Sequence, residues 1–243
     1  MLNKWLRRRN ERRAHDYLER VGVLPMLRAG NAGEIPPVLY DLHNLHRLVR
    51  SRRPRTILEF GVGFSTIVLA HALDMNLRER PDAGRRKEKG AAPPPPGVWS
   101  IDANAGWIEN ARGKVPHSLR GLVTLHHSDV RAVELAGQLC HRYTRLPNIV
   151  PDFVYLDGPD PADVKGEIEG LAFTLEHGGP RQVAAADIVL MEPSLRRGFF
   201  LVLDARYTNM HFLRHNLRRR YRIRVDRVNR LSTFELLEHT GRH

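Results

Sequence analysis

Apolar and polar positions recur along the chain with two different periods. Short apolar runs rich in branched and aromatic residues predict strands over 56–61, 98–102, 122–129, 152–158 and 199–205. Apolar residues at helical spacing predict helices over 36–54, 65–73, 105–115, 130–143, 161–173, 186–198 and 209–220. Two further runs at 221–228 and 232–239 lie close enough in the sequence to pair as strands.

Strands that alternate with helices are typical of a parallel sheet covered on both faces. The runs "DFVYL" and "FFLVL" are apolar throughout, as strands buried on both faces should be. We therefore expect an α/β fold with a doubly wound, mainly parallel sheet of seven strands. Helices would cover both faces, and the last two strands would form a terminal antiparallel pair. This Rossmann-like domain should span residues 51–243.

Two segments fall outside this alternation. Arginine mixed with apolar residues over 1–35 predicts amphipathic helices outside the main core, so 1–50 form an N-terminal helical extension. The extension offers a surface for a homodimer or a lid over a substrate, and the sequence does not choose between them. Residues 74–97 are polar, charged and rich in proline, which predicts a long mobile loop.

Composition narrows the class of protein. The chain of 243 residues is 42% hydrophobic and 27% charged, as soluble globular proteins are. No apolar run approaches the roughly 20 residues of a membrane span, and no secretory signal is visible. A single cysteine, Cys140, excludes an internal disulfide, and we interpret it as a small buried residue. These features predict a cytoplasmic protein.

Charge is the least ordinary feature of the composition. The net charge is +12, and eleven arginines between 196 and 230 face only two acids. Such a basic surface suits nucleic acid or another polyanion. RNA binding or modification by this arginine-rich face is therefore one alternative function.

An acidic residue stands at or just after each of the first five predicted strands: Glu59, Asp102, Asp129, Asp157 and Asp204. Sheets of this kind bind ligands at the carboxyl ends of their strands. Glycine after the first strand lets a ligand approach the backbone, and an acid after the second strand accepts hydrogen bonds from ribose hydroxyls. Alternatively, Asp102 and Asp129 each cap a following helix.

The glycine turn itself limits the ligand. Gly61 and Gly63 are followed by Thr66 where a dinucleotide fingerprint has a third glycine, and no Walker lysine follows. Glu59, two positions before Gly61, would repel a pyrophosphate. An adenosine that carries an amino acid and no phosphate fits better.

The segment Glu59-x-Gly61-x-Gly63, followed by Ser65 and Thr66, resembles the first motif of class I (Rossmann-like) S-adenosylmethionine-dependent methyltransferases. The resemblance runs from about Thr56 to Glu238. It implies S-adenosylmethionine as the cofactor and S-adenosylhomocysteine as the product.

The same resemblance assigns roles to the motif residues. The Gly61 and Gly63 backbone would hold the amino-acid part of the cofactor, with Glu59 supporting that turn or the ligand. Asp102 would bind the ribose and Asp129 the adenine amino group.

The segment "PDFVYLDGPD" is similar to the fourth-strand motif at the mouth of the site, where Asp157 would face the substrate as a base or an orienting group. The chain lacks the Asn/Asp-Pro-Pro-Tyr pattern of amino-group methylating members, so the resemblance implies a small-molecule acceptor. Asp157 and Asp204 match two metal-binding acids of catechol-type members, but Ala205 replaces the next ligand. We therefore expect no metal, and these two carboxylates would instead cap loops or accept from backbone amides.

Some residues near the motifs have more ordinary interpretations. We interpret Trp107 as core packing, although it lies close to where an adenine could stack. His43 and His46 are interpreted as part of a solvated helix face, and His126 and His127 as structural histidines. A second alternative function is a Rossmann-like protein without catalysis, because fold resemblance alone does not establish an activity.

Overall fold

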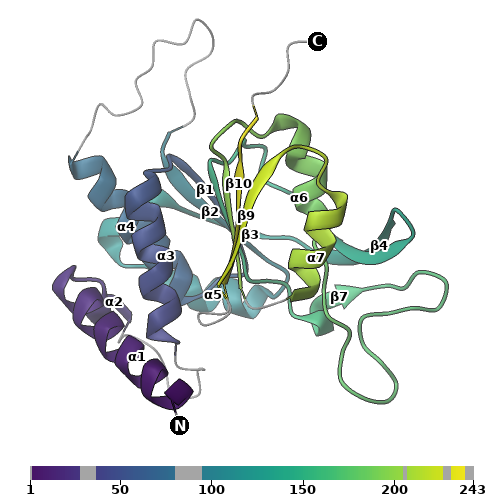
Figure 1. Cartoon of the computed structure of the whole chain (residues 1–243), viewed down its shortest axis with the longest axis horizontal. Helices are drawn as coiled ribbons and strands as arrows, with labels where there is room; N and C mark the ends of the chain where they lie inside the picture. The colour runs from purple at the N-terminus through teal and green to yellow at the C-terminus, as the bar shows by residue number, and fades with distance from the viewer. Residues whose placement is uncertain (1, 28–36, 80–94, 205–206, 227–230, 239–243) are drawn as a thin grey trace, which may run out of the picture.

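The computed structural model describes residues 2–27, 37–79, 95–204, 207–226 and 231–238, and the statements below concern these residues. Its centre is a seven-stranded sheet with the order β3-β2-β1-β6-β8-β10-β9 (Figure 1). The first five strands in this order are parallel, and β10 runs antiparallel to both β8 and β9. The strands are β1 (Thr56–Phe60), β2 (Gly97–Asp102), β3 (Val123–His127), β6 (Phe153–Leu156), β8 (Phe200–Leu203), β9 (Tyr221–Asp226) and β10 (Leu231–Leu236). The predicted seven-stranded sheet with its terminal antiparallel pair is confirmed.

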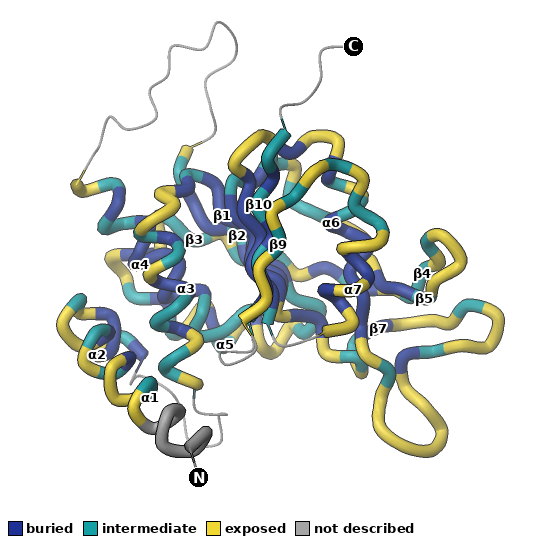
Figure 2. The backbone as a smooth tube through the Cα atoms, in the orientation of Figure 1, coloured by how far each residue is buried: buried dark blue, intermediate teal, exposed yellow. Residues whose placement is uncertain are grey.

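Continuous apolar runs form the central strands because their side chains are buried on both faces of the sheet. In β1, Ile57 belongs to one hydrophobic cluster, and Leu58 and Phe60 belong to the other. In β6, Phe153 and Val154 divide in the same way. Figure 2 shows the resulting buried centre of the molecule.

Helices cover both faces, as predicted. One face carries α1 (Leu2–Arg20), α2 (Leu24–Leu27), α3 (Leu39–Arg52) and α4 (Phe64–Glu79), while α6 (Ala186–Met191) and α7 (Tyr207–Asn216) lie on the other (Figure 1). The remaining helix, α5 (Ala105–Lys114), connects β2 to β3, and short 3-10 turns are η1 (His117–Leu122), η2 (Pro161–Asp163) and η3 (Glu192–Ser194). None of the helices in these ranges has the length and apolar character that a membrane span needs.

The N-terminal helices do not lie outside the main core, so that prediction is wrong. Leu18 of α1, Leu24 of α2 and Leu45 of α3 share one buried cluster with Ile57 of β1. The apolar positions of α1 and α2 therefore pack onto the helices α3 and α4 on one side of the sheet.

A buried polar contact also ties the N-terminal helix to the sheet-covering helices. Tyr17 Oη lies 2.9 Å from His46 Nδ1, and His46 Nε2 lies 3.1 Å from His71 Nδ1 of α4. His46 is fully buried, so the interpretation of a solvated histidine face is wrong for this residue. Burial, followed by the neighbouring His71, lowers the pKa of His46 to about 3.

The predicted helix over 130–143 is a β-hairpin, made of β4 (Val130–Leu135) and β5 (Gln138–Tyr143). Ala136 and Gly137 form its two-residue turn with φ of +52° and +71°. Positive φ at both positions is the geometry of the turn that best matches strand twist. Cys140 lies on β5 and is buried, as predicted, but in a strand.

The predicted helix over 161–173 is also wrong. Gly166, Glu169 and Gly170 have positive φ, which a right-handed helix cannot contain. Within 161–173 the named elements are η2 and the short strand β7 (Val164–Lys165). Strand β7 pairs with β4 and completes a second sheet of order β5-β4-β7.

The segment predicted as a loop over 74–97 begins later than expected. Helix α4 continues to Glu79, supported by an ion pair between Asp74 and Arg78 one turn apart. Strand β2 already starts at Gly97. The central part of the predicted loop, 80–94, lies outside the described residues.

Candidate functional site

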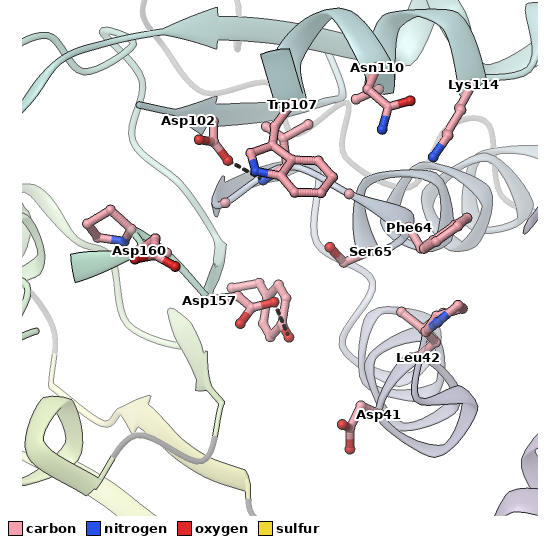
Figure 3. A pocket seen from close by; sticks show the side chains of 18 of the residues that line it. Asp41, Leu42, Phe64, Ser65, Asp102, Trp107, Asn110, Lys114, Asp157 and Asp160 are labelled. Carbon is pink, nitrogen blue, oxygen red and sulfur yellow. Dashed lines mark hydrogen bonds between the residues drawn. The ribbon is translucent and has the colours of Figure 1, made fainter. Parts of the chain in front are cut away.

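A pocket of about 470 Å³ opens at the carboxyl ends of β1, β2 and β6. From β1 the chain moves outward to β2 and β3, and then returns to the other side of β1 at β6. The pocket therefore lies at the reversal of strand order, where open α/β sheets bind ligands. It is lined by Pro37, Val38, Asp41, Leu42, Gly61, Val62, Gly63, Phe64, Ser65, Asp102, Trp107, Asn110, Ala111, Lys114, Tyr155, Asp157, Gly158, Pro159, Asp160 and Asp163 (Figure 3).

The two glycines of the β1–α4 turn are needed for different structural reasons. Gly61 has φ of +98°, and a Cβ there would lie 3.3 Å from the backbone nitrogen of Gly158. This glycine is required for the close packing of the turns after β1 and β6. A Cβ on Gly63 would meet no protein atom within 4 Å, although Gly63 lines the pocket. The missing side chain of Gly63 therefore leaves room for a ligand.

Glu59 and Thr66 lie behind the glycine turn and are fully buried. Thr66 Oγ1 donates to Glu59 Oε2 over 2.6 Å, and the Gly63 N–H donates to Thr66 Oγ1 over 3.2 Å. Ser100 of β2 also donates to Glu59 Oε2. Burial raises the pKa of Glu59 to about 7, although these hydroxyl contacts lower it in part. Both residues hold the turn in place from behind the pocket wall.

Asp102 lines the pocket at the end of β2 and is partly exposed. Its Oδ2 accepts from the Val62 N–H over 2.9 Å, and its Oδ1 accepts from the Asn104 N–H over 2.8 Å. Each oxygen keeps a second lone pair that can accept from a ligand. The alternative interpretation as a helix cap is wrong, because the N-cap of α5 is Asn104.

Trp107 is not core packing, contrary to our interpretation. Its first-turn position on α5 leaves it 44% exposed and places it in the pocket lining. Trp107 and Asp102 lie on one wall, and Asp41 and Leu42 of α3 lie on the opposite wall, with Asp157 between them (Figure 3).

Asp157 follows β6, and Tyr155 donates to its Oδ2 over 3.2 Å. Tyr155 is only 8% exposed but reaches the pocket. Burial, followed by the carboxylates of Asp157 and Asp204, raises the pKa of Tyr155 well above its usual value. The phenol therefore stays protonated and holds Asp157 at the wall.

Sequence reasoning missed three further acids of the pocket: Asp41, Asp160 and Asp163. Asp41 is in the first turn of α3, far from the sheet motifs in sequence. Asp160 caps η2 by accepting from the Ala162 N–H over 2.9 Å. The Asp-Pro pair at 160–161 is a turn signal that could have identified this cap.

Besides Glu59 and Thr66, two further predicted site residues lie apart from the pocket lining. Asp129 forms an ion pair with Lys165 of β7 at 2.6 Å, and this contact lowers the pKa of Asp129. The alternative interpretation of Asp129 as a helix cap is wrong because a strand, β4, follows it. Asp204 follows β8 and is also not part of the lining. Within the described ranges, no group of three or more His, Cys, Asp or Glu residues is arranged to hold a metal ion.

Several arginines of the C-terminal segment have structural partners. The Arg219 guanidinium donates to the carbonyl oxygens of Glu192, Leu195 and Glu238. Arg222 on β9 forms an ion pair with Glu235 at 3.1 Å. Part of the basic charge in this region therefore stabilises the end of the sheet.

Comparisons with known proteins support the fold. No protein-family model and no curated protein matches the chain. The crystal structure of an S-adenosylhomocysteine-bound methyltransferase from Podospora anserina aligns with a TM-score of 0.50 at 11% identity, over 93% of this chain and 88% of that one. At this identity the similarity shows the fold alone, which is Rossmann-like.

Two other structures align over most of their length at lower scores. The O-methyltransferase TomG from Streptomyces achromogenes, in complex with S-adenosylmethionine, has a TM-score of 0.44 at 16% identity, over 94% of this chain and 90% of that one. A putative RNA methyltransferase from Pyrococcus horikoshii has a TM-score of 0.44 at 10% identity, over 93% and 99%.

Proposed function

We propose that the protein is an S-adenosylmethionine-dependent methyltransferase that acts on a small-molecule acceptor. The observation that carries the proposal is the meeting of Gly63 and Asp102 in one pocket at the reversal of strand order. Gly63 leaves open space where any other residue would place a side chain, and Asp102 offers acceptor oxygens beside it. A pocket of about 470 Å³ also has the size of small-molecule sites.

The residues present fit the cofactor. The N–H groups of Gly61 and Gly63 already donate to Ile101 and Thr66, so these glycines would give the amino-acid part of the cofactor room beside the turn. Ser65 and the N-terminus of α4 would hold its carboxylate, which the helix dipole favours. Asp102 would accept from the ribose hydroxyls, and the exposed ring of Trp107 would stack on the adenine.

Three predicted cofactor-binding residues lie outside the pocket lining, and this limits the roles that we propose for them. Glu59 and Thr66 would support the turn rather than touch the cofactor, because both are fully buried behind it. Asp129 would contact the adenine amino group only if its carboxylate left Lys165.

When bound, the cofactor would supply a methyl group for in-line transfer from its positively charged sulfur to the acceptor atom, with S-adenosylhomocysteine as the leaving group. The protein must therefore align the acceptor and exclude water. Asp157, which accepts a hydrogen bond from Tyr155, would orient the acceptor or receive its proton.

Binding of S-adenosylhomocysteine, measured by calorimetry, tests the proposal. Wild type should bind one molecule, and Asp102→Ala should lose about 10–100-fold in affinity because it removes hydrogen bonds to a charged group worth about 1.5–3 kcal/mol each. The matched control is Glu109→Gln on α5, which removes an exposed carboxylate outside the pocket lining. The proposal would be contradicted if wild type did not bind S-adenosylhomocysteine, or if Asp102→Ala bound it with the affinity of wild type.

The alternative of RNA binding has less support, because Arg219 and Arg222 already bind protein groups. Filter binding with RNA across a salt series tests it, since binding through phosphates weakens steeply as salt rises. The alternative of a protein without catalysis predicts no methyl transfer even when the cofactor binds.

A further inference from the structure

The charge of the pocket is opposite to that of the chain. The chain has a net charge of +12. Of the twenty residues that line the pocket, five are aspartates and one, Lys114, is basic. An acidic cavity in a basic protein concentrates cations and repels anions.

The acids are concentrated in one half of the pocket. Asp41 comes from the first turn of α3, and Asp157, Asp160 and Asp163 come from the segment that follows β6. We call these four the acidic half. Asp102 and Lys114 belong to the other half, formed by β1, β2, α4 and α5, where Lys114 Nζ lies 4.8 Å from the Phe64 ring centre.

The acidic half is held in position by other protein groups. Tyr155 is more than nine-tenths buried, and its hydroxyl donates to Asp157 inside the pocket lining. Asp160 and Asp163 are the two ends of η2, in which the Asp163 N–H donates to the Asp160 carbonyl over 3.0 Å. The short turn therefore fixes two carboxylates on adjacent positions of the wall.

These carboxylates lie close enough to repel one another. Burial, followed by the charge of Asp160, raises the pKa of Asp163. Asp163 in turn contributes to the raised pKa of Asp102, after the larger effect of burial. A cation bound beside Asp160 and Asp163 would relieve this repulsion.

The rest of the wall on this side is apolar. Pro37, Val38 and Leu42 at the start of α3 line the pocket, and Val38 is 54% exposed. A ligand that complements both features would carry an apolar body and a positively charged end.

We propose that the methyl acceptor carries a protonated aliphatic amine, which binds to Asp157, Asp160 and Asp163 while its apolar part packs against the start of α3. This inference rests on the proposed function, because it concerns the acceptor side of the same pocket. It excludes carboxylic acids and phosphate esters as preferred acceptors.

Three probes of the same shape test the proposal: 2-phenylethylamine, 2-phenylethanol and phenylacetate. Their affinities are measured by calorimetry with and without saturating S-adenosylhomocysteine. The amine should bind about tenfold more tightly than the alcohol, as expected for one hydrogen bond between charged groups in a partly buried site, and phenylacetate should bind most weakly. Asp160→Asn and Asp163→Asn should each lower the amine affinity, and the double variant should remove its advantage over the alcohol.

Three further measurements keep the test specific. Asparagine is as good a helix cap as aspartate, so Asp160→Asn should keep η2, as its melting temperature will verify. Glu176→Gln removes an exposed carboxylate far from the pocket lining and should not change the amine affinity. The double variant should bind S-adenosylmethionine and S-adenosylhomocysteine as wild type does.

Several results would overturn the proposal: equal affinity for the three probes, tighter binding of phenylacetate, no amine binding, or an amine preference that survives in the double variant. Loss of affinity for S-adenosylmethionine but not for S-adenosylhomocysteine would assign the acids to the sulfonium charge and also overturn it. If wild type fails to bind S-adenosylhomocysteine, the proposed function fails, whereas the amine preference is still measured in the free protein.

Discussion

The two halves of the pocket differ in how the chain builds them. The half formed by β1, β2, α4 and α5 takes its residues from two consecutive strand–helix units, each at the point where the strand meets the helix, and Glu59 supports it from behind. The acidic half brings Asp41 of α3 beside a segment more than a hundred residues further along the chain. Local motifs therefore determine one wall, while long-range packing of α3 against the sheet determines the other.

The largest expected effect comes from breaking the junction between the halves. Gly61→Ala places a methyl group at φ of +98° and 3.3 Å from the backbone of Gly158. We expect a loss of about 2–4 kcal/mol in the free energy of unfolding, because the backbone is strained and both turns must move. Urea denaturation measures it. Gly113→Ala in α5, where a Cβ meets no atom within 4 Å, should be neutral or stabilising. Equal stability of the two variants would contradict the packing role of Gly61.

A smaller effect should be confined to the first half. Trp107→Ala removes an exposed ring, so the folded state should lose less than about 1 kcal/mol. Stacking of a base on an aromatic ring is worth about 1–3 kcal/mol, so the affinity for S-adenosylhomocysteine should fall about tenfold. Calorimetry measures the affinity, and thermal melting measures the stability. An unchanged affinity would remove Trp107 from the adenine site.

A pH-dependent effect concerns the buried support of the first half. The pKa of Glu59 is raised to about 7, so the folded state keeps a proton that the unfolded state loses near pH 4.5. Stability should therefore fall as the pH rises from about 4.5 to 7, by at most about 1.4 kcal/mol per pH unit for one group.

Asp187 adds a fall of the same sign, because burial raises its pKa to about 7. Glu59→Gln should remove the contribution of Glu59 and keep those of the other carboxyl groups, and so show a flatter dependence on pH. Denaturation midpoints at several pH values measure this, and a variant with the wild-type dependence would rule out Glu59 as a source.

The sequence predicted the sheet well because period and apolar content are local properties. It also led to Gly61, Gly63, Ser65, Asp102 and Asp157, which all line the pocket. It could not show that Gly61 serves packing while Gly63 faces open space, because that difference depends on Gly158 of a distant strand.

The main errors have a physical origin as well. Over 130–143 the apolar spacing suits a helix, and only the positive φ at Ala136 and Gly137 reveals a hairpin. Of the acidic half, the sequence led to Asp157 but not to Asp41, Asp160 or Asp163. Asp41 in particular reaches the pocket only because α3 packs beside β6. Neither the hairpin nor the position of Asp41 follows from the periodicity of one segment.

The most direct test of the central claim compares wild type with Gly63→Ala. A Cβ at this position meets no protein atom, so the variant should fold with the stability of wild type. It should nevertheless lose S-adenosylhomocysteine binding in calorimetry, by about 100-fold or more, because the methyl group occupies the space of the ligand. One-to-one binding by wild type with none detected for Gly63→Ala is the predicted result. Equal binding by both proteins, or binding by neither, would contradict the account.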